Sequence, residues 1–546
     1  QDYEFWSAKT SNRGMGTSYA KNAVDKYTMF TLENMLFYDK TFNDKHTLGV
    51  TLLQSIQEDK RESVNVAMEN LPADNLKYYD LGSGLVTNTI GSSMIKWNMA
   101  SFMGRINYNY LGRYLLTVSA RYDGSSRLAD GHKWVLFPSA ALAWRINEES
   151  FMSSTSGWLD NLKLRLGFGK TGNSAVDPYQ TKGTLSLIRY PFDNGGTPTI
   201  GYAPNAMANS LLTWETTDQW NLGIDFGVLR GRINGTIDLY MQNTHDLLLK
   251  RQLPVVSGFP DVLSNVGKTR NKGIEVSINS MNINSKDFQW TTDLMLSSNK
   301  EEIVELYNGK NDDIGSKWFI GQPVNVHYDY RKVGIWQNTE SDLAEMAKFA
   351  ANGTEFAPGD IKIQDVNGDY KITDADKQIL GNSRPKLIAS MVNTFNYKGF
   401  DLSVFLYASF GAMLYNDIYA VEHCGRNGGV KVDYWTPNNP TNAYPRPSID
   451  EERPIYITST YYEKADFLRV KTMTLGYTLP KTLTNKFLVE KLRVYFTAQN
   501  PFIFTNYTGI DPEAAKVNSA GNPETNGSGF GTPSVSSWIF GINLTL

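Results

Sequence analysis

The last nine residues of the chain, Trp538–Leu546, constrain its fold more than any other segment. Five apolar residues at alternate positions share one face of a β-strand there: Trp538, Phe540, Ile542, Leu544 and Leu546. Gly541, Asn543 and Thr545 share the opposite face, and Ile539 is its only apolar member. A soluble domain rarely ends on a bare apolar strand, because such an edge invites aggregation. We therefore predict a strand that closes a barrel between lipid and a polar lumen, which makes transport across an outer membrane the first hypothesis.

The composition agrees with a barrel of this kind. No apolar run in the 546 residues approaches the ~18 that a membrane helix needs, and the mean hydropathy is -0.37. Barrels combine membrane insertion with such polarity because residues that face the lumen dilute the hydropathy. The aromatic content of 12% suits the girdles at the two membrane interfaces. A net charge of -3 argues against nucleic acid as a partner.

The cysteine content and the first residues of the chain bear on disulfide formation and on a signal peptide. The single cysteine, Cys424, excludes an internal disulfide. The sequence starts at Gln1 without a signal peptide, so we expect either a mature chain or a fragment.

Alternation of apolar and polar residues recurs along the sequence. In Tyr114–Tyr122, apolar side chains at even positions oppose Thr117, Ser119 and Arg121. The same pattern occurs in Trp97–Tyr110, Gly273–Asn279 and Leu492–Gln499. Its polar members with long side chains, which include Arg105, Asn107, Arg493 and Gln499, need water or polar partners. A lumen or a plug would supply both.

The connections between the predicted strands alternate in length. Short turns occur at Thr41–Lys45, Leu111–Arg113, Arg230–Arg232, Met281–Lys286 and Lys398–Phe400. Long excursions occur at Gln57–Ile95, Gly172–Leu211, Lys250–Arg270, Lys300–Pro385, Gly411–Asp466 and Pro501–Ser536. Short turns on one side and long loops on the other are typical of outer-membrane barrels.

Counting back from the last strand gives about fifteen spanning strands. Val324–Trp336 is strand-like, but counting it as spanning would put the tight turn Tyr397–Phe400 on the outside. We therefore assign 300–385 to one extracellular excursion with β-structure of its own. Single-chain bacterial barrels have even strand numbers, so the odd count predicts that 1–546 is the C-terminal part of a longer barrel.

One motif within that excursion, residues 365–376, has the ligand order of an EF-hand calcium loop. Oxygen ligands fall at positions 1, 3, 5, 9 and 12, with a backbone carbonyl at position 7: Asp365, Asn367, Asp369, Thr373, Asp376 and the Lys371 carbonyl. Position 6 is Tyr370 rather than glycine, although Gly368 can relieve the turn, and position 12 is Asp rather than the usual Glu. The motif predicts a structural Ca²⁺, or a similar divalent ion, that stiffens the loop. The alternative is a solvated acidic turn.

No residue pattern indicates catalysis. The five histidines, His46, His132, His245, His327 and His423, are too scattered for a zinc site. His423-Cys424 is best interpreted as two loop residues, since nothing nearby in the sequence lowers the thiol pKa. The carboxylate pairs Glu301-Glu302 and Glu451-Glu452 are interpreted as solvated surface, and no nucleophile, phosphate-binding or metalloprotease motif occurs. The sequence therefore predicts that the chain is not an enzyme.

Several segments together resemble the SusC/RagA family of TonB-dependent outer-membrane transporters from Bacteroidetes. These segments are Tyr114–Ser126 with Lys133–Arg145, Gly359–Asp369, Phe467–Pro480, and Leu492–Phe504 with Tyr507–Glu513. Each segment alone is moderately specific, but their order and spacing extend the resemblance over nearly the whole chain.

The resemblance implies an all-β fold, a transmembrane antiparallel barrel of about 22 strands that is filled by an N-terminal plug. No stretch of this chain is similar to that plug or to a TonB box, so the plug and roughly seven strands would lie upstream, given the barrel sizes of this class. The resemblance also implies a SusD-like surface lipoprotein as a lid and energy from the TonB–ExbB–ExbD system through the N-terminal region. It allows an assembly of two transporter–lipoprotein pairs.

The leading hypothesis is thus active import of an oligosaccharide or an oligopeptide across the outer membrane. A passive porin or structural barrel without energy coupling is the alternative that the strand pattern alone permits. A surface enzyme or adhesin is a third hypothesis, and a large soluble β-protein is the simplest one. The loop aromatics Trp214, Trp318 and Trp435 can stack on a substrate, but each is more simply interpreted as loop packing.

Overall fold

The computed structural model describes residues 1–13, 16–190, 192, 199–416, 431–447, 454–487, 489–513 and 534–545. His423, Cys424, Glu451, Glu452 and Leu546 lie outside these ranges. Within the described residues, no helix is both long enough and apolar enough to cross a bilayer.

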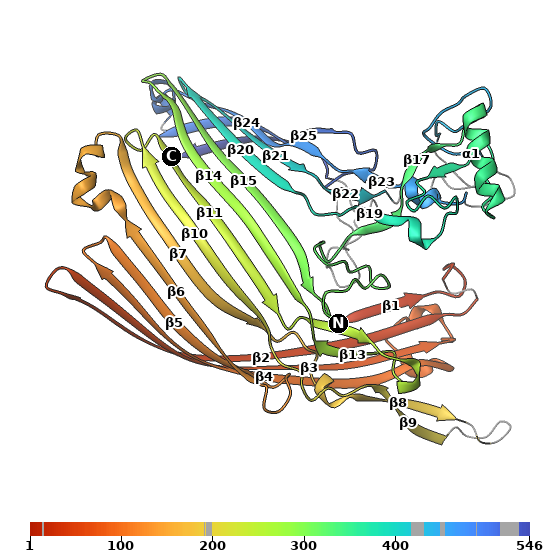
Figure 1. Cartoon of the computed structure of the whole chain (residues 1–546). Coiled ribbons are helices and arrows are strands. Elements are labelled where there is room, and N and C mark those ends of the chain that lie inside the picture. Colours follow the sequence, from red (N-terminus) through yellow and green to blue (C-terminus); the bar gives the residue numbers. More distant parts are fainter. Residues whose placement is uncertain are drawn as a thin grey trace. The chain divides into compact units, whose positions relative to one another are not determined.

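Nearly half of the described residues form one antiparallel sheet of sixteen strands (Figure 1). In pairing order these are β1 (Asp2–Trp6), β2 (Tyr19–Phe42), β3 (His46–Glu69), β4 (Val86–Tyr110), β5 (Tyr114–Ser125), β6 (Trp134–Arg145), β7 (Leu159–Asn173), β10 (Glu215–Val228), β11 (Ile233–His245), β14 (Lys268–Asn284), β15 (Phe288–Glu305), β20 (Leu387–Tyr397), β21 (Phe400–Phe410), β24 (Phe467–Thr478), β25 (Lys491–Thr505) and β26 (Ser537–Thr545). All except the five-residue β1 have nine residues or more. Fifteen long strands among the described residues match the number expected from the sequence.

The smaller elements lie in the long connections. Five two-stranded sheets pair β8 (Thr184–Tyr190) with β9 (Thr199–Ala206), β12 (Leu248–Gln252) with β13 (Asp261–Asn265), β16 (His327–Tyr330) with β19 (Lys377–Gly381), β17 (Lys332–Ile335) with β18 (Ile361–Ile363), and β22 (Met413–Tyr415) with β23 (Tyr462–Lys464). The α-helices are α1 (Glu340–Ala351) and α3 (Lys481–Thr484). Short 3₁₀ turns are η1 (Asp74–Leu76), η2 (Leu81–Ser83), η3 (Ile146–Glu148), η4 (Ser150–Thr155), η5 (Gln180–Lys182), η6 (Val255–Ser257), η7 (Asp374–Asp376), η9 (Ile457–Thr460) and η10 (Asn485–Phe487).

The chain divides into two compact units, and each is described by itself. Unit 1 comprises residues 1–143, 167–220 and 243–268, and unit 2 comprises residues 144–166, 221–242 and 269–546.

Unit 1 contains the longest strands of the protein. β2 and β3 have 24 residues each and pair without interruption, from Tyr19 opposite Glu69 to Phe42 opposite His46. A transmembrane strand needs only about 9–11 residues, so these strands extend well beyond a bilayer. The predicted excursion Gln57–Ile95 is therefore wrong in extent: only residues 70–85 leave the strands, because both β3 and β4 continue far past the membrane region.

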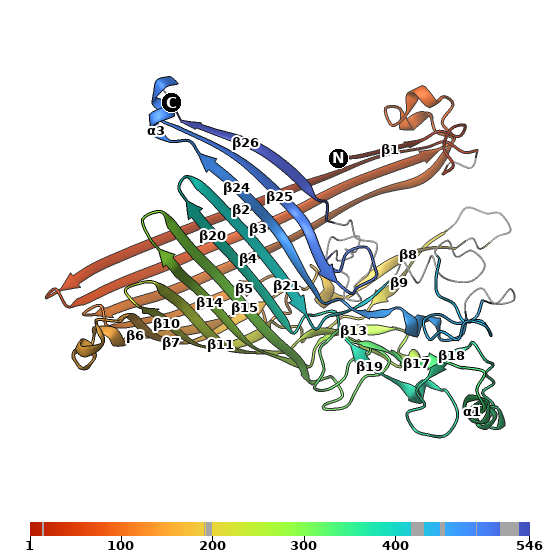
Figure 2. The same cartoon turned by 90° about the horizontal axis from the view of Figure 1, so that it is seen from above.

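Unit 2 carries the excursion that follows β15. The turns between β14 and β15 and between β20 and β21 lie at one end of these strands, while β19, β22, β23 and α1 lie at the other (Figures 1 and 2). The expected β-structure is present in this excursion as β16 to β19. The excursion also contains the helix α1, which was not predicted; its first turn is capped by the Thr339 hydroxyl accepting from the Asp342 N–H.

Candidate functional site

Alternate residues of the long strands form an apolar face of the sheet. In β26, Trp538, Phe540 and Ile542 are at least 60% exposed although all three are large and apolar. They pair across the strands with residues of β25, where the Phe496 ring stacks on Trp538 at 5.7 Å between centroids. In unit 1, Leu116 and Val118 of β5 are exposed in the same way. An apolar face of this extent needs lipid as its solvent.

The opposite face of the sheet is polar, and its charges are paired between strands. Arg493 of β25 donates two hydrogen bonds, of 2.9 and 2.5 Å, to the carboxylate of Asp401 in β21. Arg165 of β7 reaches both Asp225 of β10, at 2.9 Å, and Asp238 of β11, at 3.0 Å. These contacts place the predicted Arg493 on the polar face, as the alternation indicated.

Unit 1 also has a polar face, where the ion pair lies within one strand and hydrogen bonds join neighbouring strands. The Arg121 side chain of β5 donates to both carboxylate oxygens of Asp123, at 2.8 and 2.9 Å, and to the Ser101 hydroxyl of β4 at 2.9 Å. The Ser119 and Ser139 hydroxyls share a hydrogen bond of 2.6 Å. These polar contacts suit a face that meets water or a polar partner.

Large side chains on this face lie flat over glycines of the neighbouring strand. A Cβ at Gly541 of β26 would overlap the ring of Tyr495, and a Cβ at Gly273 of β14 would overlap the ring of Tyr240. At Gly476 of β24 the obstacle would be the Arg493 guanidinium. These glycines allow side chains to lie along the sheet instead of standing out from it.

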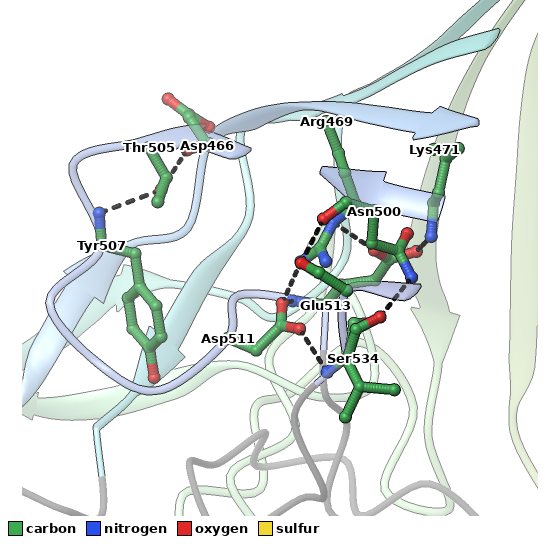
Figure 3. Close-up of polar contacts among 11 residues, drawn as sticks. Asp466, Arg469, Lys471, Asn500, Thr505, Tyr507, Asp511, Glu513 and Ser534 are labelled. Atoms are coloured by element: carbon green, nitrogen blue, oxygen red, sulfur yellow. Dashed lines mark hydrogen bonds and ion pairs between the residues drawn. The ribbon is translucent and has the colours of Figure 1, made fainter. Parts of the chain in front are cut away.

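Arg469 of β24 anchors the connection that follows β25 (Figure 3). Its guanidinium lies 2.5 Å from Asp511 and 3.0 Å from Glu513, and Lys471 pairs with the same Glu513 carboxylate. Asp511 also accepts hydrogen bonds from the backbone N–H groups of Glu513, at 2.9 Å, and Ser534, at 3.0 Å. We call these residues, Arg469, Lys471, Asp511 and Glu513, the β24 latch. This latch was not predicted, because Arg469 and Asp511 lie 42 residues apart in the sequence.

The predicted calcium loop is held by hydrogen bonds from its backbone N–H groups to its own aspartate side chains. Asp365 accepts from the N–H of Gly368 at 2.8 Å and from that of Tyr370 at 2.9 Å, and Asp369 accepts from Lys371 N–H at 2.8 Å. Asp376 is fully buried and accepts from the N–H groups of Val366 and Thr373, which joins the start of the loop to its end. Asn367 donates to Asp369 at 3.0 Å, and Thr373 caps η7.

Tyr370 adopts the backbone conformation that position 6 of such a loop requires. Its φ is 57°, in the left-handed region usually taken by glycine. The Tyr370 ring packs edge-on against Phe349 of α1 at 5.5 Å, and the Lys348 ammonium lies 5.2 Å from its centre. Packing against α1 thus offsets the steric cost of this conformation.

Within the described ranges, no three His, Cys, Asp or Glu side chains gather closely enough to hold a metal ion. The loop would therefore depend on its amide, hydroxyl and carbonyl oxygens as well as on its carboxylates. Four of the five histidines lie within the described residues. His327, for example, is buried beside β22, where its Nε2 lies 2.8 Å from the Met413 carbonyl and burial lowers its pKa.

The loop aromatics support packing more clearly than ligand binding. Trp214 is buried in a unit 1 core with Phe137 and donates from its indole N–H to the Lys133 carbonyl at 2.8 Å. Trp435 is buried in a unit 2 core with Ile335 and Ile361. Both side chains are used in the cores of the connections.

Comparisons with a family profile and with known proteins agree on one family. The profile of the family described as "TonB dependent receptor-like, beta-barrel" matches residues 1–500. TonB-dependent receptor P3 of Formosa agariphila is 32% identical over 531 residues, covering 94% of this chain and 52% of that protein. TonB-dependent receptor SusC of Bacteroides thetaiotaomicron is 35% identical over 434 residues, covering 76% of this chain and 41% of that protein.

Solved structures share the fold. The RagAB peptide transporter superposes with a TM-score of 0.80 at 22% identity, over 97% of this chain and 56% of that one. This chain spans about half the length of the curated relatives that it matches.

Proposed function

This chain belongs to the TonB-dependent receptor-like β-barrel family, and from that premise we propose that the whole protein imports an oligosaccharide or an oligopeptide across the bacterial outer membrane. Its resemblance to SusC and RagA is confirmed, as are its all-β fold and its outer-membrane location. The family is one of receptors and transporters, not of enzymes.

The observation that carries the proposal is the family match over residues 1–500. The two faces of the sheet support it, because an apolar face suits lipid and a polar face suits a water-filled or plugged lumen. Charges on that polar face are paired with each other, as Arg493 is with Asp401. Such pairs stay intact when a polar solute or a plug moves through the lumen.

The resemblance to SusC and RagA supports the remaining parts of the proposal. A SusD-like lipoprotein would cover the extracellular mouth, and the TonB–ExbB–ExbD system would act through the N-terminal region of the whole protein. RagAB is a peptide transporter, which supports an oligopeptide as one of the two candidate substrate classes. Two transporter–lipoprotein pairs would form the assembly.

Uptake by cells that carry the full-length receptor tests the proposal. Labelled oligosaccharides and labelled oligopeptides are tested separately, and one of the two classes should enter cells with an intact TonB system and stay outside cells that lack TonB. Purification from native membranes should recover a surface lipoprotein with the receptor. Open single-channel conductance together with TonB-independent uptake would instead favour a passive porin.

We also propose that the loop 365–376 binds a structural Ca²⁺. Asp365, Asn367, Asp369, Thr373, Asp376 and the Lys371 carbonyl would hold it, and the left-handed conformation of Tyr370 supports this assignment. Bound Ca²⁺ would add charge neutralisation and cross-links among these oxygens, and so stiffen the excursion.

Amide hydrogen exchange of residues 365–376 in the full-length receptor tests this calcium proposal. Exchange should slow in about millimolar Ca²⁺, the range of extracellular sites, and recover with a chelator. An Asp365→Asn, Asp369→Asn variant should lose this response. Equal exchange of the natural loop with and without Ca²⁺ would contradict calcium binding and favour the alternative interpretation, a solvated acidic turn.

A further inference from the structure

A cavity of about 740 Å³ in unit 2 lies where β15, β20 and β21 lead into the excursion. Four basic side chains line it, Lys300, Arg384, Lys386 and Lys464, against two carboxylates, Glu301 and Asp466. The cavity therefore has an excess of two positive charges, although the whole chain has a net charge of -3. We call it the basic cavity.

Two of the four cations already have carboxylate partners. Arg384 pairs with Glu301, whose side chain is only 7% exposed and which also accepts from the Val324 N–H at 3.2 Å. Lys300 lies 3.5 Å from Glu302. The charge of these two cations is thus largely balanced within the protein.

Lys386 and Lys464 are different. Both are exposed, and within the described residues neither has a carboxylate oxygen within 4.0 Å of its ammonium. The other carboxylate of the cavity, Asp466, accepts the backbone N–H of Gly411 at 2.5 Å. The Lys386 stem lies over Gly411, because a Cβ at that glycine would come within 2.9 Å of it. Two exposed ammonium groups therefore line the cavity, with charge available for a ligand.

The neutral part of the lining indicates which kind of anion suits the cavity. It includes the amide side chains of Asn299, Gln322 and Asn382, and it contains no Trp, Tyr or Phe. Sugar rings commonly bind by stacking on aromatic faces, which this lining does not offer. Amides both donate to and accept from peptide groups, so lysines with amides suit an extended peptide that carries carboxylates.

We propose that the basic cavity binds the carboxylate side chains of an acidic oligopeptide on its way into the barrel. This inference rests on the proposed import function and specifies its substrate class. Lys386 and Lys464 provide the charge that recognises the ligand, while Arg384 pairs with Glu301 and Lys300 lies beside Glu302.

Binding to the purified full-length receptor, together with any lipoprotein that co-purifies, tests this assignment. The probe is a fluorescent peptide that alternates glutamate with glycine, compared with the same peptide carrying glutamine instead. The glutamate peptide should bind more tightly, and its binding should weaken as salt is added. A Lys386→Gln, Lys464→Gln double variant should weaken it about five- to tenfold, as expected for two exposed charge pairs.

Lys398→Gln is the matched control, because Lys398 lies in the turn at the other end of the β20–β21 hairpin and pairs only with Asp287 among the described residues. It should leave binding unchanged, and circular dichroism should show all variants folded. Equal affinity for the two peptides, or full affinity in the double variant, would overturn the proposal. So would an oligouronate that binds in a lysine-dependent manner when the acidic peptide does not. Binding is measured without TonB, so a failure of energised uptake tests the proposed function separately.

Discussion

Arg469 and Asp511 form a 2.5 Å ion pair in which each side chain is only 4% exposed, although β24 carries the first and the connection after β25 carries the second. A pair this deeply buried is neutral as a unit but costly when broken. Removing one partner leaves the other charge buried and unpaired in a low-dielectric environment, which typically costs about 3–5 kcal/mol of stability. The pair therefore determines where this connection docks.

Substituting Arg469 should release that connection. Arg469→Met would leave Asp511 and Glu513 without their shared cation, so we expect residues 505–513 to undock. Amide hydrogen exchange of this segment in the full-length receptor should speed up by at least about a hundredfold, the factor that corresponds to 3 kcal/mol. The double variant Arg469→Met, Asp511→Leu removes both charges and should recover much of the protection. Unchanged exchange in Arg469→Met would show that the latch does not hold the connection.

Acid should open the same latch only at low pH. Burial opposes ionisation of Asp511, but the backbone N–H groups of Glu513 and Ser534 and the Arg469 charge together hold its pKa below the ordinary value. A carboxylate with a lowered folded pKa stabilises above its unfolded pKa of about 3.9 and loses this contribution as the pH falls further. Exchange of residues 505–513 should therefore be constant from neutral pH to about pH 4, after correction for intrinsic rates, and rise below it. A rise near pH 6 would contradict this assignment.

The stability of the strand pair that contains Lys332 of β17 should change at alkaline pH. Burial lowers its pKa to about 8, and its ammonium donates only to the Ala443 carbonyl, at 2.6 Å, among the described residues. Between about pH 8 and 10 the unfolded chain binds the additional proton, so local stability of the β17–β18 pair should rise with pH across that window. Lys332→Met should raise the protection of this pair at neutral pH and remove the pH dependence.

Lys362 of β18 provides the matched comparison for Lys332. Burial opposes its charge, but hydrogen bonds to Glu345 and Asp342 raise its pKa overall. Lys362→Met should therefore weaken the same strand pair at neutral pH. If both methionine variants change protection in the same direction, charge burial does not distinguish the two sites.

Two substitutions of Tyr370 should separate its backbone strain from its packing. Tyr370→Gly and Tyr370→Ala both delete the ring that packs on Phe349, so both should increase amide exchange in α1. Only the alanine variant keeps a Cβ at a φ of 57°, so it should be the less stable of the two by about 1 kcal/mol. Equal exchange in the two variants would mean that the backbone at this position relaxes.

Alternation predicted the strands well where one face meets lipid and the other does not. The alternate apolar residues from Trp538 to Leu544 lie on one face, as predicted, and Arg493 lies on the polar face. A membrane imposes this strict period of two. The prediction was wrong in extent for Gln57–Ile95, because β3 continues to Glu69 and β4 begins at Val86. Charged side chains of β3 form ion pairs with both neighbouring strands, Glu58 with Lys96 of β4 at 2.8 Å and Arg61 with Asp25 of β2 at 3.2 Å.

Other features differ in whether any local signal existed. The helix α1 could have been predicted, since Thr339 precedes Asp342 by three residues and Met346 and Phe349 recur at helical spacing. The β24 latch and the basic cavity could not, because they join residues from connections far apart in sequence. The spacing of 365–376 predicted a turn-rich loop closed by Asp376, which the hydrogen bond to Val366 supports, while its calcium remains a prediction.

Gly541 should be required for folding because the Tyr495 ring occupies the position of its missing side chain. Gly541→Ala would force that ring off the sheet in the pairing of β25 with β26, at a cost of about 1–3 kcal/mol for overpacking. The folded fraction of the full-length receptor in membranes, measured by its heat-modifiable gel mobility, should fall. Tyr495→Leu in the same chain should restore it by removing the overlap. Gly91→Ala in β4 is the control, since a Cβ there meets nothing within 4 Å. If Gly91→Ala lowers the folded fraction as much as Gly541→Ala does, then loss of glycine in a strand, and not contact with Tyr495, is responsible.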